Sequence, residues 1–437
     1  EDEGANVKCL DLSVECIDDE KIKSAGLIAI YLPMHTATRI AVEVLPKIKK
    51  LNPSAYLAFY GLYAKLNKDL LLRLGGKTII SGEFEESLLH IYKKLADKKI
   101  FSNSDMVLLK RQKFRKPNRS HLPNLKNYAK LINGKAKSIT VGYTEGTRGC
   151  KHICRHCPVV NVYKGRFFVV QPDVVMEDIR QQVEAGAEHI TFGDPDFFNG
   201  PGHALRLVES FHEEFPNLTY DVTIKLEHLL AHREKLHLLT ETGCLFVTTA
   251  VEEVDNEVLS KLEKNHTRSD FEEVVQITNA LGLKLSPTFI PFHPWTSALG
   301  FVDLLSMIRD LSLIESVSPV QLGIRLLIPK GSRMLELKEV NQFLGDFREE
   351  KMSYSWEYGE KRVDELHSKV LEAIQLGVSE GANRRLIFEQ VWTLAHNAVG
   401  QSVPMLPLQS SGSSFVPVMS EPWYCCAEPT DEQVKGI

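Results

Sequence analysis

The sequence has no apolar run near the roughly 20 residues that a membrane-spanning helix needs. Its net charge is only −5 in 437 residues, so composition gives no general attraction to nucleic acid or to an anionic membrane. The N-terminus has no signal-peptide pattern. Eight cysteines, unevenly clustered, do not form the framework of a disulfide-rich protein. We therefore expect a cytoplasmic protein with no nucleic-acid or membrane partner.

Strand-like and helix-like stretches alternate over residues 26–99, which predicts a Rossmann-like parallel α/β domain at residues 1–101. Residues 102–137 are basic and interrupted by proline. We interpret them as a linker with one short helix, and their charge as a solvated strip in preference to a polyanion site.

Six further strand-like runs, with helical segments between most of them, predict a partial (βα)6 barrel over residues 138–334. Two of the intervening helices are expected to begin near Pro172 and Ser269. Residues 335–437 are predicted to form a helical C-terminal region with a mobile tail. The six predicted strands lie at residues 138–144, 189–194, 218–226, 245–251, 284–292 and 321–328.

Three cysteines, Cys150, Cys154 and Cys157, follow the first predicted barrel strand in the spacing C-x3-C-x2-C. In a parallel barrel the chemistry takes place at this end of the strands. Three thiolates suit an iron–sulfur cluster with one open iron. A structural zinc ion usually takes four ligands, and zinc or a chance cluster remains an alternative. Nearby Arg148, Lys151 and Arg155 would offset the thiolate charge.

This motif resembles the signature of the radical S-adenosylmethionine (SAM) superfamily. The resemblance implies a [4Fe–4S] cluster on the three cysteines, with SAM bound to the open iron and cleaved reductively. An electron donor such as flavodoxin or ferredoxin is implied as a partner. His156 stands where the family usually has an aromatic residue.

Residues 190–200 and 250–267 resemble the second-strand and fourth-strand segments that contact SAM in the branch with an N-terminal cobalamin-binding domain. A role as helix cap or rim charge is the alternative for Asp194 and Glu252. Glu253 replaces the small hydroxyl residue of the family. The cofactor-binding residues implied by the resemblance are Gly193, Asp194, Asp196 and Glu252, with Lys225 and Arg325 as further candidates for the SAM carboxylate.

Residues 26–99 resemble a cobalamin-binding domain, but the family's Asp-x-His-x-x-Gly motif has no counterpart. His35 lacks the neighbours of that motif. We therefore expect the N-terminal domain to play a structural or docking role, and cobalamin not to be a cofactor.

The C-terminal sequence Cys-Cys-Ala-Glu-Pro, which includes Cys425 and Cys426, resembles the CCAEP-tail subgroup of radical SAM proteins. This subgroup includes the radical SAM enzyme of arsinothricin biosynthesis. The resemblance implies a transferase that moves the 3-amino-3-carboxypropyl group of SAM to trivalent arsenic, supplied as arsenite. The two tail thiols would bind the thiophilic arsenic, with Cys244 as a candidate third thiol or a packed core cysteine.

Three alternatives remain open from the sequence. The tail can be a disordered end. The enzyme can use a 5′-deoxyadenosyl radical or methylcobalamin on another substrate. The protein can also be a non-catalytic thiol-binding or metal-binding module.

Overall fold

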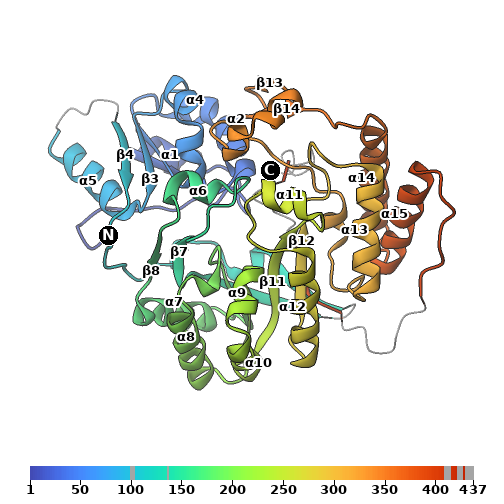
Figure 1. The fold of residues 1–437 in the computed structure, drawn as a ribbon. Coiled ribbons are helices and arrows are strands. Elements are labelled where there is room, and N and C mark those ends of the chain that lie inside the picture. Colours follow the sequence, from blue (N-terminus) through green and yellow to red (C-terminus); the bar gives the residue numbers. More distant parts are fainter. Residues whose placement is uncertain (99–103, 135–136, 408–414, 421–426, 429–437) are drawn as a thin grey trace.

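The structure is a computed structural model that describes residues 1–98, 104–134, 137–407, 415–420 and 427–428. Its N-terminal part contains a four-stranded parallel sheet in the order β1-β2-β3-β4. Figure 1 shows this part in blue, with helices packed around the sheet. The strands are β1 (Leu27–Tyr31), β2 (Tyr56–Tyr60), β3 (Thr78–Gly82) and β4 (Ser104–Leu108), and the helices are α1 (Asp19–Ser24), α2 (His35–Leu51), α3 (Leu62–Leu66), α4 (Lys68–Arg73) and α5 (Glu85–Ala96).

A second sheet forms a curled half-barrel in the strand order β12-β11-β10-β9-β6-β5-β15. The five strands from β12 to β6 are parallel, whereas β5 and β15 pair antiparallel. The predicted sixth strand joins through a single parallel bridge between Phe292 and Arg325. The strands are β5 (Lys130–Asn133), β6 (Lys137–Thr144), β9 (His189–Phe192), β10 (Thr219–Thr223), β11 (Cys244–Glu252), β12 (Leu285–Phe289) and β15 (Val418–Met419).

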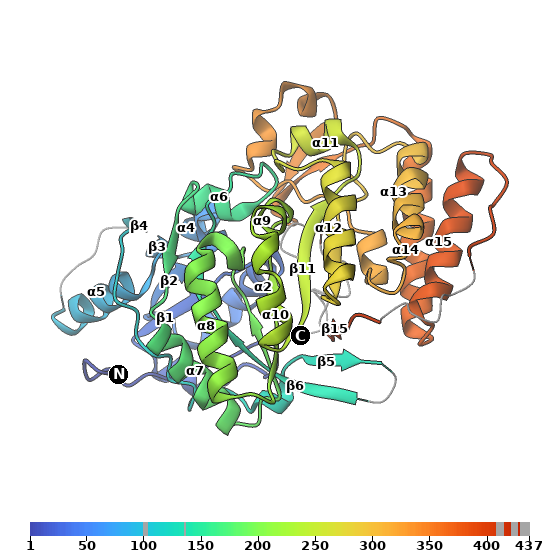
Figure 2. The ribbon, with the colours of Figure 1, turned by 60° about the horizontal axis from the view of Figure 1, so that its bottom comes forward.

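Helices cover the outside of this sheet, and β5 and β6 extend from it as a hairpin (Figure 2). Pro172 occupies the first turn of α7, and Thr267 and Asp270 form a capping box at the start of α12. Proline and a capping box are favoured at helix starts because the first backbone N–H groups have no helical acceptor. The covering helices are α7 (Pro172–Glu184), α8 (Pro201–Glu214), α9 (Leu226–Ala231), α10 (His237–Glu241), α11 (Asn256–Lys261) and α12 (Arg268–Ala280).

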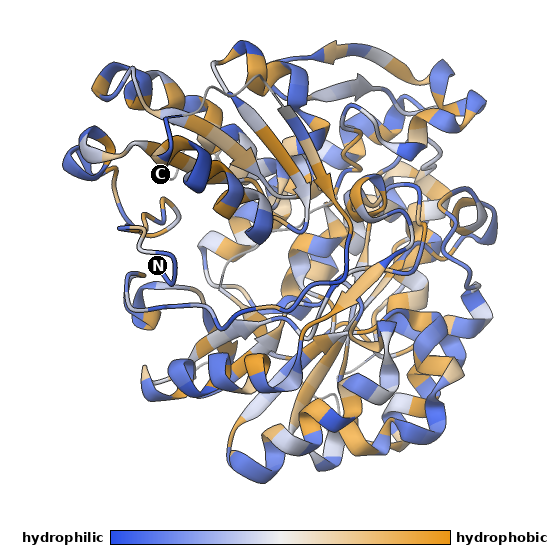
Figure 3. Cartoon of the chain, turned by 90° about the vertical axis from the view of Figure 1, so that its left-hand side faces the viewer, coloured by the Kyte–Doolittle hydropathy of each residue, from blue (hydrophilic) through white to orange (hydrophobic). Residues whose placement is uncertain are grey.

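The C-terminal region adds two long helices, which lie with the preceding helix α13 beside the barrel and are shown in orange and red in Figure 1. It also contains an antiparallel pair, β13 and β14. The apolar residues concentrate in the strands and on the inner faces of the helices (Figure 3). Among the described residues, no helix is long and apolar enough to cross a membrane. The elements are α13 (Ala298–Asp310), α14 (Arg362–Ser379), α15 (Arg384–Ala398), β13 (Leu344–Arg348) and β14 (Ser353–Trp356).

The predicted fold class, a Rossmann-like domain followed by a partial barrel, is confirmed. Three details differ from the expectation. The segment predicted as a linker contributes β4 to the first sheet and β5 to the second. The region predicted as helical contains the β13–β14 pair. The short helix expected in the linker is a single 3-10 turn, Leu125–Asn127.

Candidate active site

The three-cysteine loop joins β7 (Thr147–Gly149) to helix α6 (Pro158–Tyr163). Gly149 has φ +80°, and a Cβ atom there would lie 2.5 Å from the Tyr163 ring and 2.6 Å from the Arg166 carbonyl oxygen. Only glycine fits this backbone position without strain. The Cys157 N–H donates to the Cys154 carbonyl oxygen at 3.2 Å, which fixes the turn between these two thiols.

The thiols are buried or half-buried, and this burial shapes their acidity. Burial raises the pKa of Cys150 to about 12, and the negative charges of Asp196, Cys157 and Cys154 contribute to this rise. Burial also raises the pKa of Cys154, while the cations of Lys264 and Lys225 oppose this. Three thiols that influence one another in this way, next to buried cations, form a donor set that fits a [4Fe–4S] cluster.

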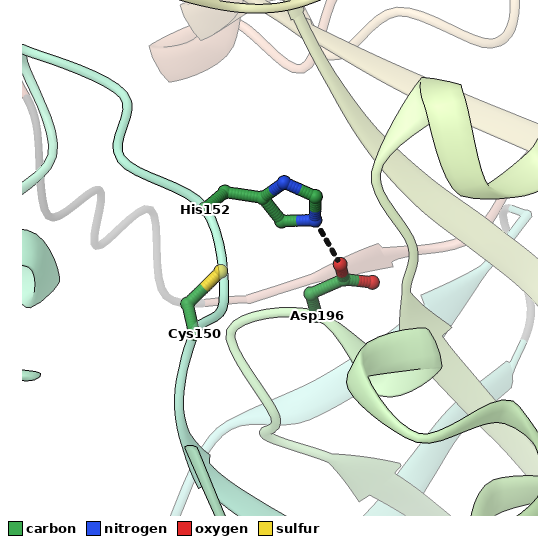
Figure 4. A group of neighbouring side chains, drawn as sticks. All are labelled: Cys150, His152 and Asp196. Atoms are coloured by element: carbon green, nitrogen blue, oxygen red, sulfur yellow. Dashed lines mark hydrogen bonds and ion pairs between the residues drawn. The ribbon is translucent and has the colours of Figure 1, made fainter. Parts of the chain in front are cut away.

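Asp196 lies beside this loop (Figure 4) and has several polar partners. Its Oδ2 atom is 3.1 Å from Nε2 of His152 and 2.7 Å from Nδ1 of His228. Burial alone would raise the pKa of Asp196, but the two histidines outweigh burial and hold this pKa well below its ordinary value. The backbone N–H of Lys225 donates to Asp196 at 3.3 Å. The structure thus brings the predicted residues Asp196 and Lys225 together.

The charged network continues from His152 to Glu227. Nδ1 of His152 is 2.7 Å from Glu227, which also pairs with Lys225 Nζ at 2.7 Å. Cys150, His152 and Asp196 place ligand atoms within 4.8 Å of one another. The His152 and Asp196 side chains bond to each other, as the dashed line in Figure 4 marks, so they are already satisfied without a metal ion.

Asp194 faces the connection between β6 and β7. It accepts hydrogen bonds from the Gly146 N–H at 2.8 Å and from the Thr147 hydroxyl at 2.6 Å. Burial raises the pKa of Asp194 to about 7. The neighbouring Gly193 N–H donates to the Thr144 carbonyl oxygen at 2.8 Å. Asp194 therefore fixes the backbone just before the cysteine loop.

Glu252 ends β11 on the same side of the barrel. Its Oε1 atom lies 3.1 Å from Nε2 of His156 and 3.2 Å from Nζ of Lys264. Burial would raise the pKa of Glu252, but Lys264 and His156 outweigh burial and lower it to about 2. The backbone of Glu252 has φ +70°, a conformation that costs free energy for a residue other than glycine. Sequence reasoning missed Lys264, because it stands in a charged segment that is typical of solvent-exposed surface.

The guanidinium of Arg325 stacks on Trp356, with Cζ 3.8 Å from the ring centroid, and pairs with Glu428 at 3.4 Å. The Glu428 N–H donates to the Arg325 carbonyl oxygen at 3.0 Å, and Ala427 bridges to Leu326. The residues that follow the two tail cysteines in sequence therefore contact the sixth segment of the barrel. Cys425 and Cys426 themselves lie outside the described residues.

Cys244 begins β11, whereas Glu252 ends it. The strand has nine residues, so these two residues are about 26 Å apart at ~3.3 Å per residue. The Cys244 thiol lies 3.3 Å from the Phe246 carbonyl oxygen. Cys244 is thus a half-buried cysteine at the opposite end of the strand from the site.

A cavity of about 500 Å³ lies between the N-terminal sheet and the start of the barrel. Its walls come from the ends of β1, β2, β3 and β6, from β7, α6 and α7, and from the segment between β4 and β5. The wall is rich in aromatic rings, and within the described residues it includes no histidine. Its aromatic side chains are Tyr31, Tyr60, Phe84, Phe114, Tyr143 and Tyr163.

Arg148 connects this cavity to the cysteine loop. Its Nη1 atom is 3.1 Å from the buried carboxylate of Glu83 and also contacts Glu85, and its Nε atom is 3.1 Å from Glu145. The guanidinium stacks on the Phe84 ring, 5.0 Å from the centroid. Since Glu83 and Glu85 belong to the N-terminal part, Arg148 joins that part to the strand that leads into Cys150.

His35 does not line the cavity. It lies at the start of α2 and packs against Tyr63, with 5.9 Å between ring centroids. Burial, assisted by the cation of Arg39, lowers the pKa of His35 to about 4. His35 is therefore a neutral core side chain.

Part of the chain matches a known family of domains. Residues 144–305 match the radical SAM superfamily model, so the chain contains a radical SAM domain. The hopanoid C-3 methylase of Methylococcus capsulatus is 25% identical over 151 residues, which are 35% of this chain and 29% of the relative. The match thus spans less than a third of that curated relative.

Two solved structures share the fold. TsrM, a radical SAM methyltransferase from Kitasatospora setae, covers 77% of this chain and 71% of its own, with 16% identity and a TM-score of 0.61. OxsB, a cobalamin-dependent radical SAM enzyme, covers 82% of this chain and 60% of its own, with 14% identity and a TM-score of 0.63. Identities this low show the fold alone.

The expectation that cobalamin is not a cofactor is wrong. One TsrM structure carries cobalamin and a [4Fe–4S] cluster, and OxsB carries aqua-cobalamin with SAM. The expectation relied on the missing histidine motif. A large planar ring can also be held by burial against aromatic surface, and the present chain has an aromatic cavity at the carboxyl ends of its N-terminal strands.

Proposed function

We propose that this protein is a radical SAM transferase with a [4Fe–4S] cluster held by Cys150, Cys154 and Cys157. When bound, the cluster supplies the electron that cleaves a carbon–sulfur bond of SAM. The observation that carries the proposal is the buried three-thiol loop beside the cations of Lys264 and Lys225. The matched radical SAM domain, which includes this loop, supports it.

The chain's own residues would bind and orient SAM around the loop. Asp196 follows β9 and Glu252 ends β11, the two strands on either side of β10. Both are buried carboxylates, suited to the ammonium and ribose hydroxyl groups of SAM. Lys225 offers a cation for the SAM carboxylate, after exchange of its bond with Glu227. Asp194 and Gly193 hold the backbone that leads into the cysteine loop. Arg325 would bind the SAM carboxylate only if its ion pair with Glu428 were broken.

The first candidate reaction is transfer of the 3-amino-3-carboxypropyl group of SAM to arsenite, with Cys425 and Cys426 as arsenic ligands. The Cys-Cys-Ala-Glu-Pro tail supports it. The contact of Ala427 with Leu326 anchors the following residues on the barrel. The reaction balances without an added oxidant. One electron, which the bound cluster would supply, breaks the carbon–sulfur bond, so 5′-methylthioadenosine leaves and a carbon-centred radical remains. The radical and the arsenic lone pair each supply one electron of the new As–C bond, and the second lone-pair electron would return to the oxidised cluster, so As(III) becomes As(V).

The second candidate reaction is methyl transfer with cobalamin, and the aromatic cavity favours it. Tyr31, Tyr60 and Phe84 would pack against the corrin, and Arg148 would fix the cavity wall. Since no described lining residue is a histidine, we expect bound cob(II)alamin to show no hyperfine coupling to a histidine nitrogen by electron paramagnetic resonance (EPR).

One experiment separates these reactions. Anaerobically reconstituted protein is given SAM, a chemical reductant or reduced flavodoxin, and arsenite, with and without hydroxocobalamin, and the products are identified by mass spectrometry. 5′-Methylthioadenosine with an arsenic–carbon product supports the first candidate. S-Adenosylhomocysteine formed only with cobalamin supports the second. Protein that binds no iron and leaves SAM intact would overturn the assignment to radical SAM chemistry.

A further inference from the structure

Lys264 is a buried cation in an unusual backbone setting. Its relative exposure is 2%, and it follows α11 between Glu263, with φ 54°, and Asn265, with φ 56°. Two left-handed residues other than glycine around one position store strain, which persists only where the surrounding structure imposes it. The fold therefore specifies where this ammonium group lies.

The segment that carries Lys264 is attached to the cysteine loop. The Arg155 N–H donates to the Leu262 carbonyl oxygen at 3.0 Å, and its guanidinium donates to the Lys261 carbonyl oxygen at 2.7 Å. Arg155 also pairs with Glu263. Because Arg155 lies between Cys154 and Cys157, these contacts fix the distance between Lys264 and those two thiols.

The charge of Lys264 is only partly compensated by carboxylate. Within the described chain, Lys264 forms an ion pair with Glu252, at 3.2 Å. Glu252 also forms a hydrogen bond with His156. An ammonium group has three donors, and removing it from water costs several kcal/mol unless anions replace the lost hydration. Cys154 and Cys157 are the next anions that attract Lys264. Lys264 and Glu252 act on the Cys154 thiolate with opposite sign.

We propose that Lys264 and Glu252 set the reduction potential of the cluster on Cys150, Cys154 and Cys157. A reduction adds one negative charge, and a fixed cation in a medium of low dielectric constant stabilises that charge strongly. Net charge near the sulfur ligands is one of the levers on cluster potential. Lys264 raises the potential toward the range of a cellular electron donor, and Glu252 limits this rise. The inference rests on the proposed cluster but not on which group is transferred.

The test is an EPR-monitored redox titration of the reconstituted protein without SAM. Lys264→Gln keeps a hydrogen-bond donor for Glu252 and removes the charge. We expect at least a tenfold lower ratio of reduced to oxidised cluster at a given potential, which is a shift of about 59 mV to more negative values for one electron. Glu252→Gln should shift the potential in the opposite direction. Lys261→Met is the matched control, because Lys261 stacks on Trp295 and pairs with Glu257, and it should leave the potential unchanged.

Wild-type potentials in Lys264→Gln and Glu252→Gln would overturn the proposal, and so would shifts of both variants in the same direction. If Lys264→Gln does not assemble a cluster, Glu252→Gln decides alone: a more positive potential supports the proposal and an unchanged one overturns it. Iron content and arsenic products are measured on the same samples. A predicted potential shift without an arsenic–carbon product would count against the transfer reaction only.

Discussion

The cavity beside the N-terminal sheet and the cysteine end of the barrel are neighbours built from different side chains. In the cavity, aromatic rings such as Tyr31, Tyr60 and Phe84 form the wall, and Arg148 forms an ion pair with the carboxylate of Glu83. At the cysteine end, the side chains close to the thiols in space include buried groups of opposite charge, such as Asp196 and Lys264. The two regions meet at the cysteine loop, because Cys150 and Cys157 pack in one apolar cluster with Leu62.

This difference shows how each region would select its ligand. An aromatic wall recognises size and planarity, with little demand on charge. The cysteine end has most of its charged groups already paired, so a ligand there must exchange partners with groups such as Glu227 or Glu252. Preorganised charges of this kind favour an ionic ligand with matching groups.

Loss of a cluster thiol is the largest expected effect, because it removes a cluster ligand at the cysteine end and leaves the aromatic cavity intact. Cys154→Ala should remove most of the bound iron and abolish SAM cleavage, since the two remaining thiolates are too few to hold the [4Fe–4S] cluster. Cys244→Ala is the control, because that thiol lies at the other end of β11, and it should keep iron and activity. Iron and sulfide analysis with EPR checks this. Full iron content in Cys154→Ala would contradict the assignment.

The next effect concerns the link between the two regions. Arg148→Met leaves the carboxylate of Glu83 buried without its cation, and we expect a loss of about 3 kcal/mol in the free energy of unfolding. Arg180→Met is the control, because its pairs with Glu177 and Glu214 are on the surface, and it should cost less than about 1 kcal/mol. Denaturant titration measures both. Equal losses would show that Arg148 has no bridging role.

Filling the cavity should act on cobalamin without affecting iron. Leu122 lines the cavity and belongs to the segment between β4 and β5. We expect Leu122→Trp to weaken hydroxocobalamin binding about tenfold, which is ~1.4 kcal/mol. Val107→Trp, at an exposed position of β4, should leave binding unchanged. Absorbance after gel filtration measures retention. Unchanged binding in Leu122→Trp would place cobalamin elsewhere.

The effect that is smallest at neutral pH is a pH dependence at the cysteine end. Burial, assisted by Lys264, lowers the pKa of His266 to about 4, whereas an unfolded histidine has a pKa near 6.5. Between these values the unfolded state binds more protons, so stability falls as pH drops from about 6.5 to about 4. His266→Gln should reduce this slope by at most about 1.4 kcal/mol per pH unit. The control variant His237→Gln, at an exposed position, should leave this slope unchanged. Unfolding titrations across this pH range decide, and an unchanged slope in His266→Gln would be contrary evidence.

Local features were predictable, and features formed by tertiary contact were not. The cysteine spacing and the helix start at Pro172 are encoded in a few consecutive residues, so the loop and its strand were found from sequence. Lys264 and Arg148 owe their roles to partners far along the chain, and their own surroundings in sequence are ordinary charged segments. The missing histidine motif led to the wrong expectation about cobalamin for a related reason. The aromatic cavity is assembled from the ends of several strands, so no single segment of the sequence predicts it.

Edge pairing also escaped prediction. The strand β15 is two residues long and pairs with β5 at Leu131 and Ile132. The Ser420 N–H donates to the Lys130 carbonyl oxygen at 2.8 Å, across 290 residues of chain.

This pairing has a consequence for synthesis of the protein. A ribosome releases β5 long before β15 exists, so β5 presents an open edge while the barrel and its helices emerge. The contact joins distant residues and requires a very long loop to close, which makes it a late folding event. A nascent chain stalled before residue 418 should therefore expose the β5 edge to chaperones, and synthesis and pairing of residues 418–420 should end that exposure.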